Sequence, residues 1–189
     1  MLTFSEAELT AWLSPLVWPF IRILALFTSA PVLGMRSVPV RVKIALALFI
    51  TVAAQASLPP APVIALDSPA ALEALVHNLL IGLALGFAAR VVFAAIEYAG
   101  ELIGLQMGLN FAAFFDPISA SQSTAVSRFF GTVATLLFVV MNGHLLMTAA
   151  VIQSFHVFPV GAAPLDFLHT LQPQVWGAEV FRLGLWIAL

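Results

Sequence analysis

Cysteine is absent from this 189-residue sequence, and charged residues make up only 8% of it, against about 25% in a typical soluble domain. Without cysteine, the chain cannot form disulfides, carry out thiol redox chemistry or bind a metal through thiolates. Seven basic and nine acidic side chains are too few to cover a soluble fold in which 62% of the residues are hydrophobic. Lipid or apolar subunits must surround such a chain, which predicts an all-α polytopic membrane protein.

Other absences narrow the function. The formal net charge of −2 offers no basic surface for nucleic acid, so nucleic acid is excluded as a partner. No zinc-protease motif, nucleophile elbow, phosphate-binding loop or dinucleotide fingerprint occurs, so we expect no enzyme, no cofactor and no metal site. The first ten residues contain Glu6 and Glu8 but no Lys or Arg, which argues against a cleaved signal peptide.

Five apolar segments follow one another, at about residues 11–32, 42–58, 69–108, 125–154 and 175–189. The third would reach roughly 60 Å as one helix, about twice the hydrocarbon thickness, so it must kink, protrude or fold back as a re-entrant hairpin. The fifth stops after 15 residues, which suggests a truncated chain. With no soluble domain or repeat in sight, residues 1–189 are expected to form a single membrane-embedded unit.

The basic residues indicate an orientation. Arg36, Arg41 and Lys43 cluster at the first connection, whereas the 58–70 and 155–175 connections carry no Lys or Arg. The positive-inside rule places the first connection in the cytoplasm and the N-terminus outside.

The third segment carries a polar face. At about 100° per residue, Arg90, Glu97 and Glu101 fall within a ~40° arc of one helix face. A charge at the bilayer centre costs at least about 2.5 kcal/mol, so these groups should face protein or water. Two small-residue ladders that permit close helix packing share or border this face, namely Gly82 and Gly86, then Gly100, Gly104 and Gly108.

We interpret this face as a helix-packing surface and a polar seam between subunits. Arg22 joins the seam, because it lies in the middle of the first segment with no acidic residue within four positions. Two alternatives stay open. The charged residues can lie outside the hydrocarbon on a protruding helix end, or Arg90, Glu97 and Glu101 can form the proton relay of a small ion-coupled transporter.

An unusual stretch follows the glycine ladder. Phe111, Phe114 and Phe115 fall within five residues and are followed by Asp116 and Pro117, then by a run of small polar residues. These phenylalanines can be ordinary lipid or core contacts. Apolar constrictions also block water and ions by dewetting, so the stretch can equally form a channel plug.

The fourth segment is expected to form one helix, and Asn142-Gly143-His144 lies within it. Side chains such as Asn142 and His144 form hydrogen bonds between helices in membranes, and we place both in the polar seam. A lone histidine here is more often structural than a metal ligand, and the other histidines show no ligand spacing with it.

Several short motifs, taken together and in order, resemble the FliR family of flagellar biosynthesis proteins and its injectisome counterparts, the SctT class. They are Ala30-Pro31-Val32, Arg36-Ser37-Val38-Pro39, the run from Glu101 through Gly104 and Gly108 to Ala112, Asp116-Pro117 and Asn142-Gly143-His144. The resemblance covers essentially the whole chain. The Gly108–Ala112 run, Asp116-Pro117 and Asn142-Gly143-His144 look more like the flagellar branch.

This resemblance implies a subunit of the flagellar type III export gate, at the basal body in the bacterial inner membrane. It implies tilted helical hairpins packed in a hetero-oligomer with the P and Q subunits (FliP and FliQ), near the FlhB switch protein. The substrates would be unfolded flagellar proteins, and the Phe-rich loop would plug the closed channel. Family members continue beyond the fifth segment, so the resemblance also implies that a C-terminal part is missing here.

Overall fold

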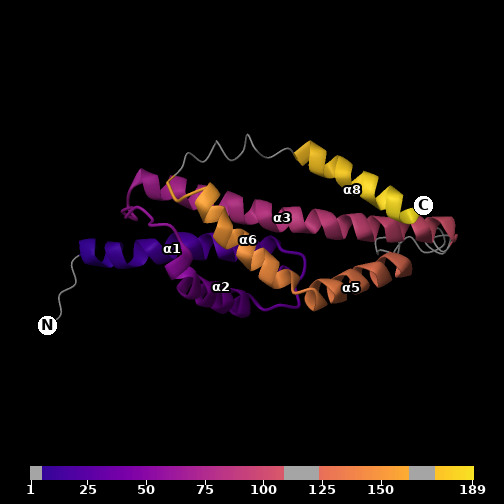
Figure 1. Ribbon diagram of the computed structural model, residues 1–189, viewed down its shortest axis with the longest axis horizontal. Helices are drawn as coiled ribbons and strands as arrows, with labels where there is room; N and C mark the ends of the chain where they lie inside the picture. Colours follow the sequence, from indigo (N-terminus) through magenta and orange to yellow (C-terminus); the bar gives the residue numbers. More distant parts are fainter. Residues whose placement is uncertain (1–5, 109–123, 162–172) are drawn as a thin grey trace. The chain divides into compact units, whose positions relative to one another are not determined.

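A computed structural model describes residues 6–108, 124–161 and 173–189, and every regular element in these ranges is a helix. The predicted plug residues Phe111, Phe114, Phe115, Asp116 and Pro117 lie outside the described residues. The elements, shown in Figure 1, are α1 (Glu6–Ser29), α2 (Val40–Ala54), the short 3-10 helix η1 (Gln55–Ser57), α3 (Pro69–Gln106), α5 (Ala125–Val140), α6 (Gly143–Val157) and α8 (Pro173–Ala188). The all-α prediction is confirmed.

Three helical stretches are long and apolar enough to cross a membrane, at Thr10–Ser29, Val40–Ser57 and Pro69–Gln106. A fourth is possible if α5 and α6 act together as one broken span. These stretches match the first four apolar segments of the sequence to within a few residues. The protein is therefore a polytopic, all-α membrane protein.

The third segment forms one unbroken helix of 38 residues, α3. The re-entrant hairpin considered for this segment is therefore wrong. Glycine alone does not interrupt the helix, because its neighbours are strong helix formers and the glycines are used for packing. At 1.5 Å per residue α3 is about 57 Å long, which leaves a kink or a protrusion to accommodate the excess length.

The prediction of one helix at 125–154 is wrong, because two helices, α5 and α6, occupy this segment. Asn142 has a φ of 55°, in the left-handed region, and stands between the end of α5 and the start of α6. Asparagine accepts this conformation more readily than most residues. The ring of Phe138 lies where a side chain at position 143 would be, so any larger residue there would have to displace that ring.

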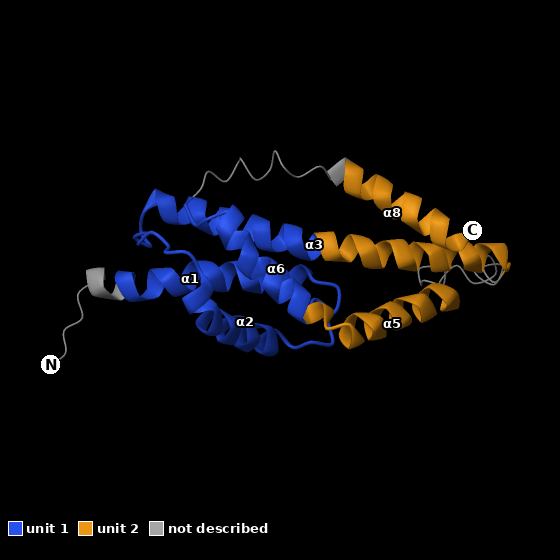
Figure 2. Cartoon of the chain, viewed as in Figure 1, with its two compact units in different colours: residues 1–87, 145–171 blue, residues 88–144, 172–189 orange. Residues whose placement is uncertain are grey.

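The described residues belong to two compact units (Figure 2). Unit 1 comprises residues 1–87 and 145–171, and unit 2 comprises residues 88–144 and 172–189. Helix α3 continues from the first unit into the second. The expectation of a single membrane-embedded unit stays a prediction.

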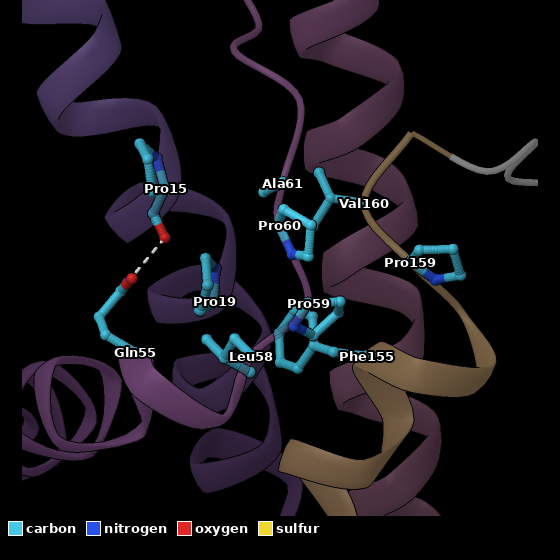
Figure 3. A pocket seen from close by; sticks show the side chains of 10 residues that line it. All are labelled: Pro15, Pro19, Gln55, Leu58, Pro59, Pro60, Ala61, Phe155, Pro159 and Val160. Atoms are coloured by element: carbon cyan, nitrogen blue, oxygen red, sulfur yellow. Dashed lines mark hydrogen bonds between the residues drawn. The ribbon is translucent and has the colours of Figure 1, made fainter.

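Two prolines inside α1 shape unit 1. Pro19 has no N–H, so the carbonyl of Pro15 one turn earlier has no donor within the helix. Gln55 supplies the donor, because its Nε2 lies 2.9 Å from the Pro15 oxygen. Figure 3 shows this bond at the rim of a cavity of about 290 Å³ that is lined mainly by proline rings and by Phe155. The proline defect in α1 is thus the docking point for η1.

Ser14, directly before Pro15, forms three further hydrogen bonds. Its hydroxyl accepts from the Trp18 indole at 3.0 Å and from the Ile64 backbone N–H at 3.2 Å, and it donates to the Pro62 carbonyl. The bonds to Ile64 and Pro62 fasten the 58–68 connection to α1. Trp18 and Ile64 then pack in an apolar cluster with Ala74, Phe155 and Val160.

Aromatic contacts hold unit 2 together. Phe93 on α3 meets Phe138 on α5 edge to face, with ring centroids 5.7 Å apart. Tyr98 on α3 meets Phe181 on α8 in the same manner at 5.2 Å. The Tyr98 ring also occupies the space where a side chain at Gly184 would be, so α8 approaches α3 closely at that glycine. Both α5 and α8 therefore pack on the second half of α3.

Candidate functional site

The second half of α3 and the whole of α5 pack against each other in antiparallel fashion. Gly104 lies against Thr124, Gly100 against Ser127, and Gly131 against the Glu97 side chain. A Cβ atom at Gly100 would stand 2.6 Å from the Ser127 Cα, so the two backbones meet directly. Gly100 and Gly104 of the predicted ladder therefore lie against the start of α5 in the same chain.

Hydrogen bonds reinforce this contact at the start of α5. Thr124 is the N-cap residue, and its Oγ1 accepts from the Ser127 N–H at 3.1 Å. The Thr124 N–H donates to Glu101 Oε1 at 3.0 Å. The Ser127 hydroxyl donates to the Glu97 carbonyl oxygen at 2.9 Å. The first turn of α5 is therefore bonded to α3 at two points.

The chain leaves α3 just before residue 109 and enters α5 just after residue 123. Gly108 has a φ of 70°, and such a glycine ends a helix without steric cost. The Gly104–Thr124 contact and the Glu101–Thr124 bond both join the end of α3 to the start of α5. Both described ends of the Phe-rich segment are thus held together at one place, which we call the loop base, formed by Glu101, Gly104, Gly108 and Thr124.

A second polar cluster lies in unit 1 around Arg22, whose side chain is fully buried. Its guanidinium donates to Asn78 Oδ1 at 2.9 Å, to Ser154 Oγ at 3.1 Å and to the Phe158 carbonyl oxygen at 2.9 Å. It also lies over the Phe155 ring, 3.8 Å from the centroid. The partners of Arg22 therefore come from α3 and from the C-terminal end of α6.

The other glycine pair on α3 packs in unit 1 against α1. A Cβ atom at Gly82 would overlap the Arg22 carbonyl oxygen and stand 2.7 Å from the Ala25 Cβ. At Gly86 it would overlap Ser29. Since close approach at Gly82 brings α1 onto α3, it also brings the Arg22 side chain within reach of Asn78.

The residues of the predicted polar seam are divided between the two units. Arg22 belongs to unit 1, whereas Arg90, Glu97, Glu101, Asn142 and His144 belong to unit 2. Arg90, Glu97 and Asn142 are exposed, and Glu101 and His144 are half-buried. Among the described residues no ion pair joins Arg90 to Glu97 or Glu101, and the pair that does form is Arg182–Glu179 on α8. Glu101 binds a backbone N–H instead.

Sequence reasoning missed several residues at these sites, namely Asn78, Ser154, Thr124 and Ser127. A signal was present for one of them, because a threonine directly before an apolar run is typical of a helix N-cap. No such signal marked Asn78 and Ser154, which meet Arg22 from 56 and 132 residues away in the sequence.

Comparisons with known proteins identify the family to which the chain belongs. Residues 13–189 match the family described as "Bacterial export proteins, family 1". The flagellar biosynthetic protein FliR of Escherichia coli K12 is 43% identical over 189 residues, which cover the whole chain and 72% of that protein. FliR of Pectobacterium carotovorum is 42% identical with the same coverage. FliR of Bacillus subtilis is 34% identical over 78% of the chain and 57% of that protein. The chain therefore belongs to family 1 of the bacterial export proteins, the FliR family.

Proposed function

We propose that this chain is a subunit of the flagellar protein export gate, and that residues 109–123 form the plug that closes its channel. Family membership assigns a role in the flagellar export apparatus. The gate and its plug are the more specific function that we propose within this apparatus. The observation that carries the plug proposal is the loop base, which holds both ends of a segment with three phenylalanines in five residues.

The physical reason lies in the residues of the segment. A ring of apolar side chains in a narrow passage excludes water and therefore ions, without any chemical step. Phe111, Phe114 and Phe115 supply the apolar side chains, and Asp116-Pro117 marks where the run ends. We propose that a passing chain displaces this segment and that the segment then returns.

The partners follow from the same reasoning. Large apolar side chains are exposed on every long helix of the described chain, for example Phe49 on α2 and Trp186 on α8. Lipid and other apolar subunits are the surroundings that such surfaces require. We propose the P and Q subunits, FliP and FliQ, as the neighbours, with the FlhB switch protein nearby and unfolded flagellar proteins as substrates. The complex would stand in the bacterial inner membrane at the flagellar basal body, with this chain as one membrane-embedded unit.

Ion leakage across the inner membrane tests this proposal. Cells with the complete gate are compared with cells in which residues 110–121 of this chain are deleted. The plug predicts a leak in the deletion variant while the complex still assembles, which co-purification of the subunits verifies. A membrane as tight as wild type, with the complex intact, would mean that the Phe-rich segment is structural packing.

A triple substitution of Phe111, Phe114 and Phe115 by serine keeps the length of the loop and should also leak. Phe49→Ser on α2 is the matched control, because Phe49 is an exposed phenylalanine outside the Phe-rich segment. It should leave the membrane tight. If Phe49→Ser leaked equally, the leak would report general damage to the gate and not the loss of a plug.

A further inference from the structure

The start of α5 has an incomplete capping arrangement. In a capping box, the N-cap Ser or Thr accepts the N–H of the third helical residue, and a Glu or Gln at that third position accepts the N–H of the N-cap residue. Thr124 supplies the first half, since its Oγ1 accepts the Ser127 N–H at 3.1 Å. The third helical residue is Ser127, whose hydroxyl is bonded to the Glu97 carbonyl oxygen and does not reach back to Thr124.

Glu101 supplies the missing half from another helix. Its Oε1 accepts the Thr124 N–H at 3.0 Å, the bond that a Glu at position 127 would make in an ordinary capping box. Gly104, one turn further along α3, leaves room for the Thr124 side chain, whose Oγ1 would stand only 3.2 Å from a Cβ atom at that position. The cap of α5 is therefore complete only while α5 rests on α3.

We infer that Glu101 is a positioning residue that completes the N-cap of α5 from α3 and thereby fixes the base of the 109–123 segment. The geometry of the cap does not depend on the proposed plug function. Its expected consequence, an ion leak when the cap is lost, rests on that function. It assigns Glu101 the role of a hydrogen-bond acceptor. A proton carrier or the partner of a buried cation would be a different role.

The acceptor role distinguishes two substitutions. Glu101→Gln keeps the length of the side chain and an oxygen that can accept the Thr124 N–H. Glu101→Ala removes the acceptor and leaves that N–H without its bond. A proton relay or a charge partner would lose its function in both variants, whereas a cap is lost only in the second.

Amide hydrogen exchange in the purified, detergent-solubilised gate complex measures the cap directly. Loss of an N-cap interaction typically raises local opening roughly fivefold, so Glu101→Ala should exchange about fivefold faster over residues 124–128. Glu101→Gln should stay within about twofold of wild type. Glu73→Ala is the matched control, because Glu73 is an exposed carboxylate on the same helix, and its exchange over 124–128 should be unchanged.

Ion leakage of the same variants tests the consequence. Faster exchange together with a leak in Glu101→Ala, and neither in Glu101→Gln, supports the inference. Wild-type exchange in Glu101→Ala would overturn the cap. Equal damage in Glu101→Gln would overturn the acceptor role, and faster exchange with a tight membrane would overturn the link to the loop base. If the 110–121 deletion itself does not leak, the proposed function fails, whatever the exchange experiment shows.

Discussion

The contact between α3 and α5 at Gly100 gives a prediction whose magnitude follows from the structure. In Gly100→Ala the new Cβ would stand 2.6 Å from the Ser127 Cα, whereas ordinary contact begins at 3.4 Å. The obstacle is backbone and cannot rotate away, so α5 must move back by about 0.8 Å. Overpacking of this kind costs about 1–3 kcal/mol of stability.

Glycine to alanine also changes helix propensity, which by itself stabilises a helix by about 0.5–1 kcal/mol. Gly177 on α8 isolates this effect, because no atom lies within 4 Å of a Cβ atom placed there. The propensity gain cancels when the two variants are compared. Gly100→Ala should therefore be about 1–3 kcal/mol less stable than Gly177→Ala.

Thermal unfolding of the purified complex, followed by tryptophan fluorescence, measures this difference. The expected order of midpoints places Gly177→Ala highest, wild type next and Gly100→Ala lowest. Gly104→Ala should lie between Gly177→Ala and Gly100→Ala, because its nearest neighbour is a threonine side chain at 3.2 Å that can shift slightly. If Gly100→Ala melts as high as Gly177→Ala, the close packing of α5 on α3 is refuted.

Three further substitutions test other parts of the structure by the same melting assay. Arg22→Met should lower stability by about 2–4 kcal/mol, because it removes the donor of three hydrogen bonds, two of them buried. The exposed Arg182→Met should cost less than about 1 kcal/mol, and equal midpoints would contradict the buried cluster. Asn142→Ala should cost about 1–2 kcal/mol at a φ of 55°, and Asn142→Gly should cost nothing; a stable alanine variant would argue for a continuous helix. Gln55→Glu removes the donor to the Pro15 carbonyl and should cost about 1–3 kcal/mol, so an unchanged midpoint would show that η1 does not depend on this bond.

The apolar segments could be predicted because hydrophobic length alone specifies a membrane helix. The break at Asn142 was missed, although Asn-Gly is a turn signal, because the surrounding run is apolar enough to read as one helix. The glycine ladders indicated faces suited to close helix packing. They could not say that Gly82 meets α1 while Gly100 meets α5, because a periodic pattern identifies a face and not its neighbour.

For the charged residues too, the sequence pattern identified a helix face but not the groups that contact it. Helix periodicity placed Arg90, Glu97 and Glu101 on one face, but it could not show that Glu101 binds the N–H of Thr124, 23 residues away. Arg22 was recognised as needing a distant partner because it had no acid nearby. That its partners are an amide, a hydroxyl and a carbonyl oxygen depends on how α1, α3 and α6 pack within unit 1.

Photo-cross-linking from inside the loop tests most directly the claim that residues 109–123 close the export channel. A photoreactive amino acid is placed at Phe114 in one strain and at Phe49 on α2 in another, and an export substrate is stalled in the assembled gate. The account predicts cross-links between the substrate and position 114, and none from position 49. Substrate cross-links from position 49 with none from position 114 would contradict it, because the passage would then lie along α2 and not past the Phe-rich loop.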